Sequence, residues 1–254
     1  MSVLLLLGFL LAITTIIVCG TQGIYILLGI FCNISLFFIQ LYLFQKGWPI
    51  YGVTVIAFSM ITMVTLFFVN GLNHKTKAAG ISVLLFMLFF TLLVVIAADK
   101  LSIHGFSAEE VLGFSELEMS VGVDFRQLSF SVILLSLSGA VIDSSMAVAS
   151  ATFEVFEHHP DITFRMLLQS SVQIVKSILS STINTLLFAF MGSGLALVIW
   201  IIDLGYSFGE IVNSKAFVSE LSTAIFSGIG AVAVLPLTSC IAAYLYVKTK
   251  AAKQ

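Results

Sequence analysis

The chain has 254 residues, of which 59% are hydrophobic and only 9% are charged, and its mean hydropathy is +1.14. A soluble globular domain carries roughly a quarter of its residues as charged side chains, so this composition excludes that class. The net charge of −2 leaves no basic excess for nucleic acid. We therefore expect a lipid bilayer to surround an all-α, polytopic transmembrane helical bundle.

The cysteines give no sign of a metal site or a disulfide framework. Cys19, Cys32 and Cys240 all lie in apolar segments, without a CxxC or Cys/His spacing. Such cysteines typically behave as small hydrophobic residues in a packed interior, so we expect them to be buried. No phosphate-binding loop is present either. We therefore expect no cofactor and no enzymatic activity.

Apolar runs in the chain are long enough to cross ~30 Å of hydrocarbon at ~1.5 Å per residue. The first run lacks a basic leading segment, so it is expected to be retained as a span rather than removed as a signal peptide. Seven spans are the simplest count, with four in an N-terminal region (1–98) and three in a C-terminal region (128–254). The predicted spans are 2–19, 23–44, 51–69, 79–98, 128–147, 183–202 and 222–246.

The distribution of loop charges predicts the orientation, because cytoplasmic loops carry an excess of Lys and Arg. Of the 11 basic residues, four flank one side of the predicted spans and seven flank the other, which includes the C-terminal tail. This predicts an outside N-terminus and a cytoplasmic C-terminus. The acidic segment 99–127 is then extracytoplasmic, either as a solvated connector or as a vestibule that attracts cations.

The region before the sixth span mixes polar and apolar side chains and follows the stop signal Pro160-Asp161. On a helix with ~100° per residue, its polar residues fall within one arc of roughly 100°. Residues 162–182 are therefore predicted to form a separate amphipathic helix, either interfacial or re-entrant. The polar arc consists of Ser170, Gln173, Ser177, Ser180, Ser181 and Asn184.

The fifth span carries one acid, Asp143, inside an apolar run. A carboxylate in hydrocarbon costs at least ~2.5 kcal/mol, so its side chain is expected to point at protein rather than lipid. The small residues on its helical face would allow close approach of a neighbouring helix. Asp143 is then a proton- or cation-binding group on a transport path, a structural partner of Lys176, Asn184 and nearby backbone, or part of an intramembrane enzyme site. The last is disfavoured because no second carboxylate, Ser/Lys pair or metal triad accompanies it at that depth. Its face also contains Ser136, Gly139, Ala140, Ala147, Ser150 and Glu154.

A polar site is predicted around Asp143 from the depth of each residue in the membrane. Counted from residue 128, Asp143 lies ~22 Å down the fifth span, and the sixth span starts on the nearer, cytoplasmic side. Lys176 is long enough to reach towards it. The predicted ion or substrate pathway consists of Asp143, Lys176, Ser177, Asn184 and Thr185.

Two further patterns are weaker. Gly139, Gly228 and Pro236 are candidates for helix packing or hinges, and the proline is either a structural kink or a functional hinge. The spacing i, i+3, i+4 of acidic and imidazole side chains at the end of the fifth helix can hold a divalent metal, although a solvated helix end shows the same pattern. That set is Glu154, Glu157 and His158.

Several of these stretches resemble the YibE/F-like family of bacterial integral membrane proteins, over roughly residues 128–246. The resemblance also implies Gly-Arg-Asp where this chain has Val-Lys-Ser at 175–177, so the second acid of that motif is replaced by Ser177. The matching segments are 139–143, Met146, 149–151, Ser170, Lys176, 184–189, 192–193, 227–228 and 236–238.

The resemblance implies a transport-like protein of the bacterial cytoplasmic membrane, in a short form without an extracytoplasmic N-terminal domain. It also implies either a homo-oligomer or a pair with a longer homologous membrane protein, which could supply the missing acid. The sequence thus predicts a permease-like transporter, or a subunit of one, with a polar site centred on Asp143. The alternative is a non-transporting structural or assembly subunit in which Asp143 holds helices together.

Overall fold

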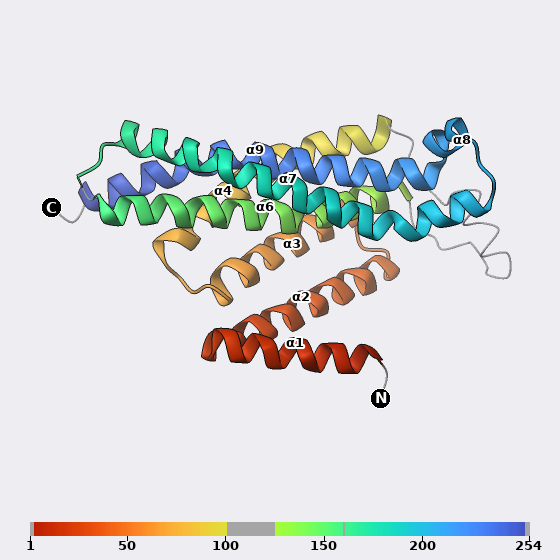
Figure 1. The fold of residues 1–254 in the computed structure, drawn as a ribbon, viewed down its shortest axis with the longest axis horizontal. Helices are drawn as coiled ribbons and strands as arrows, with labels where there is room; N and C mark the ends of the chain where they lie inside the picture. The colour runs from red at the N-terminus through yellow and green to blue at the C-terminus, as the bar shows by residue number, and fades with distance from the viewer. Residues whose placement is uncertain (1–2, 101–124, 160, 252–254) are drawn as a thin grey trace.

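A computed structural model describes residues 3–100, 125–159 and 161–251, and every regular element in these ranges is a helix (Figure 1). The predicted acidic loop at 99–127 lies almost wholly outside the described residues. The elements are α1 (Val3–Cys19), α2 (Thr21–Gln45), α3 (Ile50–Met63), the π-helix η1 (Val64–Phe68), α4 (His74–Lys100), α6 (Phe125–His158), α7 (Phe164–Asp203), α8 (Phe208–Asn213) and α9 (Lys215–Ala251).

Six helical segments of the described chain are long and apolar enough to cross a membrane: α2, the continuous α3–η1 segment, α4, α6, α7 and α9. Helix α1 is apolar but shorter, because its 17 residues rise only about 25 Å. The predicted all-α bundle of membrane helices is therefore confirmed. The predicted count of seven spans is not.

The prediction of a separate interfacial or re-entrant helix at 162–182 is wrong. Helix α7 runs without a break through 40 residues, so the predicted helix and the sixth span form a single rod of about 60 Å. Helix α6 does end before Pro160, as predicted. Thr163 then caps the start of α7 by accepting a hydrogen bond from the Met166 N–H. No glycine or proline follows until Gly192, so nothing in the sequence ends the helix where it enters the apolar run.

Helix α6 lies at the centre of the bundle and packs against α9, α4, α7 and α3 (Figure 1). Its inner face is apolar and fully buried at Leu134, Leu137 and Val141. Helix α9 comes closest at Gly230, where an added Cβ would lie 1.9 Å from Cδ1 of Leu137. Such close approach gives the dispersion contacts that hold helices together in lipid.

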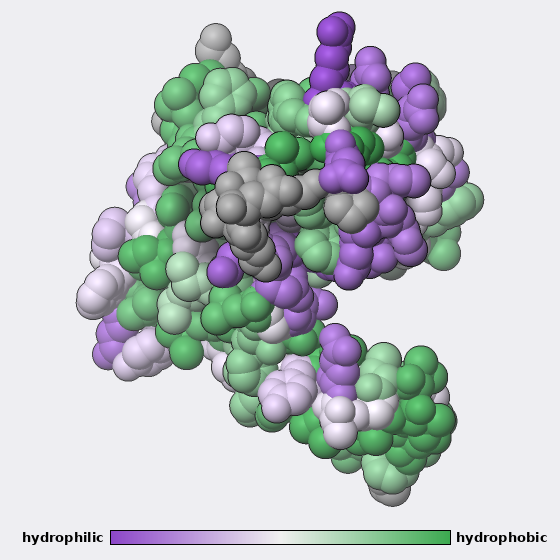
Figure 2. Space-filling view, turned by 90° about the vertical axis from the view of Figure 1, so that its left-hand side faces the viewer, coloured by the Kyte–Doolittle hydropathy of each residue, from purple (hydrophilic) through white to green (hydrophobic). Residues whose placement is uncertain are grey.

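Helices α1 and α2 form an arm beside this bundle. The arm packs against the bundle mainly through contacts of α2 with α3 and η1, and only 11% of the apolar window of α2 is buried. In a view along the long axis, the arm projects from the main body and a notch separates the two (Figure 2). Its surface is mostly hydrophobic, as expected for helices surrounded by lipid.

The two ends of the bundle differ in the elements they carry. The start of α4, the α6–α7 turn and the end of α9 lie at one end, which we call the turn end (Figure 1). Short helix α8 lies at the other end and begins with a capping box of Ser207 and Glu210. The Ser207 hydroxyl and backbone N–H donate to the Glu210 carboxylate, which lowers the pKa of that carboxyl.

Candidate functional site

Asp143 lies on the face of α6 that the chain leaves open. Asp143, Gly139 and Ala147 are exposed, and Ser150 is half-buried. A Cβ added at Gly139 would have no atom within 4 Å. The predicted face of small residues is therefore present. At one end of it the Ser136 hydroxyl meets Ser227 of α9 at 3.1 Å, whereas Gly139 and Asp143 are left open. Asp143 points away from the packed interior instead of into it.

The depth of the predicted site follows from one contact between α6 and α7. The hydroxyls of Thr152 and Ser171 lie 2.8 Å apart, and the two helices are antiparallel. Asp143 precedes Thr152 by nine residues, and residue 180 follows Ser171 by nine. Because the helices are antiparallel, Asp143 is therefore level with about residue 180 of α7. Lys176 and Asn184 each lie about 6 Å from that level, on opposite sides of it. On this count, Lys176 and Asn184 lie within about one helical turn of the level of Asp143.

The predicted partners on α7 do not bond to Asp143. Lys176, Ser177, Asn184 and Thr185 are all exposed. Among the described residues, no ion pair or hydrogen bond joins any of these side chains to Asp143. Lys176 lies about 120° round α7 from Ser170, whereas Ser177 and Asn184 lie within about 40° of it. The helical wheel thus places Ser177 and Asn184 along one polar face, and Lys176 lies about 40° beyond Ser180 at the edge of that face.

An open pocket of about 710 Å³ lies between α6 and α7 at the turn end. Its apolar lining is Val155, Ile162 and Ile174. Its polar lining consists of Glu154, His158, His159, Ser170 and Gln173. Glu154 belongs to the same face of α6 as Asp143, and Ser170 and Gln173 begin the polar arc of α7. The pocket therefore joins the two polar faces that the sequence predicts separately.

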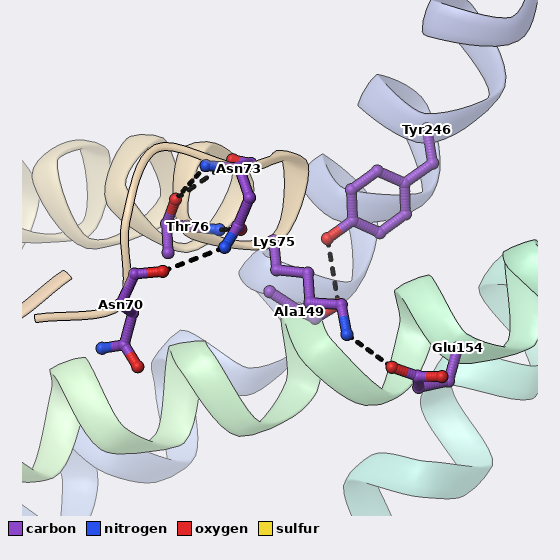
Figure 3. A network of polar contacts seen from close by, with 7 residues as sticks. All are labelled: Asn70, Asn73, Lys75, Thr76, Ala149, Glu154 and Tyr246. Atoms are coloured by element: carbon purple, nitrogen blue, oxygen red, sulfur yellow. Dashed lines mark hydrogen bonds and ion pairs between the residues drawn. The ribbon is translucent and has the colours of Figure 1, made fainter. Parts of the chain in front are cut away.

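The carboxylate of Glu154 is bound by Lys75, which comes from the start of α4 (Figure 3). The Lys75 ammonium also lies 5.1 Å from the ring centroid of Phe153. Within the described ranges, no group of three or more His, Cys, Asp or Glu side chains is arranged to hold a metal. Glu154 thus links two helices in this structure, and Glu157 and His158 do not join it in a ligand cluster.

Other polar contacts at the turn end were not anticipated from the sequence. The Tyr246 hydroxyl of α9 donates to the Ala149 carbonyl of α6 at 2.9 Å (Figure 3). Asn73 and Thr76 cap the start of α4 reciprocally, with each backbone N–H donating to the other side chain. The Asn-x-x-Thr spacing was a local signal for this cap. Tyr246 and Ala149 are 97 residues apart, so no local signal existed for that pair.

The predicted packing and hinge residues of α9 lie in a continuous helix. Pro236 is inside α9, which continues to Ala251. Gly228 has open space around its Cα and lines an apolar pocket between α7 and α9. Close packing occurs instead two residues later, at Gly230.

Helices of this length and apolarity, packed round a central helix, define a multi-pass helical membrane protein. The chain matches the family model described as YibE/F-like protein over residues 7–248, which is nearly its whole length, and it belongs to that family. The match extends beyond 128–246, so helices α1 to α4 are also part of the family's sequence. No curated protein and no solved structure matches the chain.

Proposed function

We propose that the protein is a non-enzymatic, permease-like transporter, or a transporter subunit, and that Asp143 binds a proton or small cation on its path. One observation supports this most directly. Asp143 lies within a membrane-spanning helix, at an exposed position, and forms no ion pair or hydrogen bond with another described residue. Intramembrane acids are costly to retain, and they typically mark ion pathways and proton relays.

The polar arc of α7 supports the same proposal, a path for a proton or small cation. Ser177 and Asn184 are exposed and extend the face that starts at the pocket. Hydroxyl and amide oxygens can replace part of the hydration shell of a small cation without adding charge. Asp143 would then be the charged group in a chain of neutral ligands.

Transport can be tested with purified protein in liposomes, by following proton uptake or cation flux under an imposed potential. The Asp143→Asn variant keeps the size of the side chain and removes its charge. We expect it to lower flux at least about tenfold while its abundance in the membrane stays normal. Glu157→Gln is the matched control, because Glu157 is an exposed acid of the same helix and does not line the pocket.

Two results would reject the transport proposal. One is flux through the Asp143→Asn variant equal to that of the wild type. The other is wild-type flux of protons and small cations no greater than in liposomes without protein.

The second candidate is a structural or assembly subunit, in a homo-oligomer or paired with a longer homologous membrane protein. The open space at Gly139 supports it, because a small residue that no helix of the described chain covers suits close contact with another molecule. In that case Asp143→Asn lowers the abundance of the assembled complex. Co-purification of differently tagged copies distinguishes a homo-oligomer from a pair with a different chain.

We also propose that the protein lies in the bacterial cytoplasmic membrane with its turn end in the cytoplasm. Lys75, Arg165 and Lys248 belong to elements at that end, and basic residues favour the cytoplasmic side. Tags placed at the N-terminus and at the C-terminus of the protein, and labelled in intact cells, would test this orientation.

A further inference from the structure

Glu154 of the turn-end pocket and Asp143 lie along one face of α6. Glu154 follows Asp143 by 11 residues, which places it about 20° away on the helical wheel and about 16 Å along the axis. The positions between them on this face are Ala147, which is exposed, and Ser150, which is half-buried. Both side chains are small, so this stretch of α6 presents no bulky side chain between the pocket and Asp143.

Helix α7 carries a polar face that starts at the same pocket. Gln173 lines the pocket, and Ser177, Ser181 and Asn184 follow it at intervals of three or four residues. This spacing keeps the side chains on one face of a helix. All of them are exposed. The polar face therefore extends from the pocket past the level of Asp143.

The charges along this route are not equal. Glu154 at the pocket is neutralised by Lys75. Asp143 has no ion pair in the described chain, so it is the uncompensated acid of the pair. A cation that enters at the pocket therefore meets a compensated carboxylate first and an uncompensated one deeper in the protein, which favours inward movement.

We infer that the α6–α7 pocket is the aqueous entrance to Asp143, and that Gln173 and Glu154 form its rim for a proton or small monovalent cation. The cargo named here rests on the proposed transport function. The route itself concerns only the access of water to Asp143, so it can be tested without measuring transport.

Cysteine accessibility tests the route directly. In a variant with Cys19, Cys32 and Cys240 replaced by alanine, single cysteines are introduced and labelled with a membrane-impermeant maleimide in sided membrane vesicles. We expect Ala147→Cys and Asn184→Cys to react at least about tenfold faster when the reagent is added on the side of the turn end.

Ile183→Cys is the depth-matched control for Asn184→Cys. The two positions are adjacent on α7 and both are exposed, but Ile183 lines the apolar pocket against α9. We expect it to react slowly from either side. Equal rates at 183 and 184, or failure of both Ala147→Cys and Asn184→Cys to react, would overturn the inference.

A blocking substitution then tests the pocket itself. Gln173→Trp places a bulky side chain at the rim and is expected to slow the labelling of Ala147→Cys at least about fivefold. Val172→Trp is the control, because Val172 is also exposed but lies about 100° round the helix, away from the pocket lining. Unchanged labelling in the Gln173→Trp variant would show that water reaches Asp143 by another way.

These results separate the route from the function. Labelled cysteines together with normal flux in Asp143→Asn would keep the entrance and reject the transport proposal. Unlabelled cysteines together with lost flux in Asp143→Asn would keep transport and reject this entrance.

Discussion

The inner and outer faces of α6 carry different kinds of polar group. On the inner face, the polar groups are neutral hydroxyls, and several of them meet partners on other helices, such as Ser145 with Thr238 and Thr152 with Ser171. On the outer face, Ser136 meets Ser227 of α9 and Glu154 pairs with Lys75, but the carboxylate of Asp143 has no ion pair or hydrogen bond to another described residue. The contacts between the described helices therefore do not use the charge of Asp143.

The comparison has a physical basis in the lipid solvent. Lipid tails are as apolar as leucine, so burying apolar surface between helices gains little, and close packing with interhelical hydrogen bonds supplies the stability. Neutral hydroxyls can satisfy each other at small cost, whereas a buried charge needs a counter-charge. Changes on the inner face should therefore affect stability more than changes at the exposed positions of the outer face.

The largest expected effect is at the closest contact of the inner face. Gly230→Leu forces a side chain into the space of Leu137, and we expect a loss of about 3 kcal/mol or failure to fold. Gly139→Leu adds the same atoms on the open face and is expected to leave the melting temperature of the solubilised protein within a few degrees. Size-exclusion chromatography after heating in detergent measures both. A Gly139→Leu variant as unstable as Gly230→Leu would contradict the comparison.

A smaller effect is expected at the hydrogen bond between α9 and α6. Tyr246→Phe removes the hydroxyl that donates to the Ala149 carbonyl, and a bond of this kind contributes about 1 kcal/mol. Tyr244→Phe is the control, because its ring lies on the exposed side of α9. Heat stability in detergent should fall for the first variant and not for the second. Equal stability of the two would mean that this contact adds nothing to the bundle.

The smallest effect is expected at the contact that sets the α6–α7 register. Thr152→Val leaves the buried Ser171 hydroxyl without this partner, and interhelical hydrogen bonds in membranes contribute about 0.6 kcal/mol. Ser150→Ala, on the outer side of the same helix, should be neutral. The same heating assay in a matched detergent resolves the two variants if several replicates are averaged. Unchanged stability of Thr152→Val would show that the Thr152–Ser171 contact does not stabilise the bundle.

Much of this organisation could be predicted from periodicity. The face of small residues around Asp143 and the polar arc of α7 both follow from a ~100° repeat, and the structure keeps them exposed. The break expected before the sixth span does not occur, because a stop signal at Pro160 says where a helix ends and nothing about how far the next one runs.

Other features could not be predicted because they join distant parts of the chain. The Lys75–Glu154 ion pair spans 79 residues, and neither side chain differs in sequence from an ordinary solvated charge at a helix end. The helix-packing role predicted at Gly139 and Gly228 is untested, but the closest approach is at Gly230, since which glycine meets the neighbouring helix depends on the crossing point of α6 and α9.

Gln40 shows what this architecture implies for synthesis of the protein. Its amide is almost fully buried and donates to the Ser131 hydroxyl of α6 at 2.8 Å, although Ser131 is made 91 residues later. Until α6 enters the membrane, Thr54 at 3.4 Å is the nearer group in sequence that can accept from this amide. Helices α1 to α4 therefore enter the bilayer before α6, the central helix of the bundle, and α7 and α9 complete the bundle afterwards.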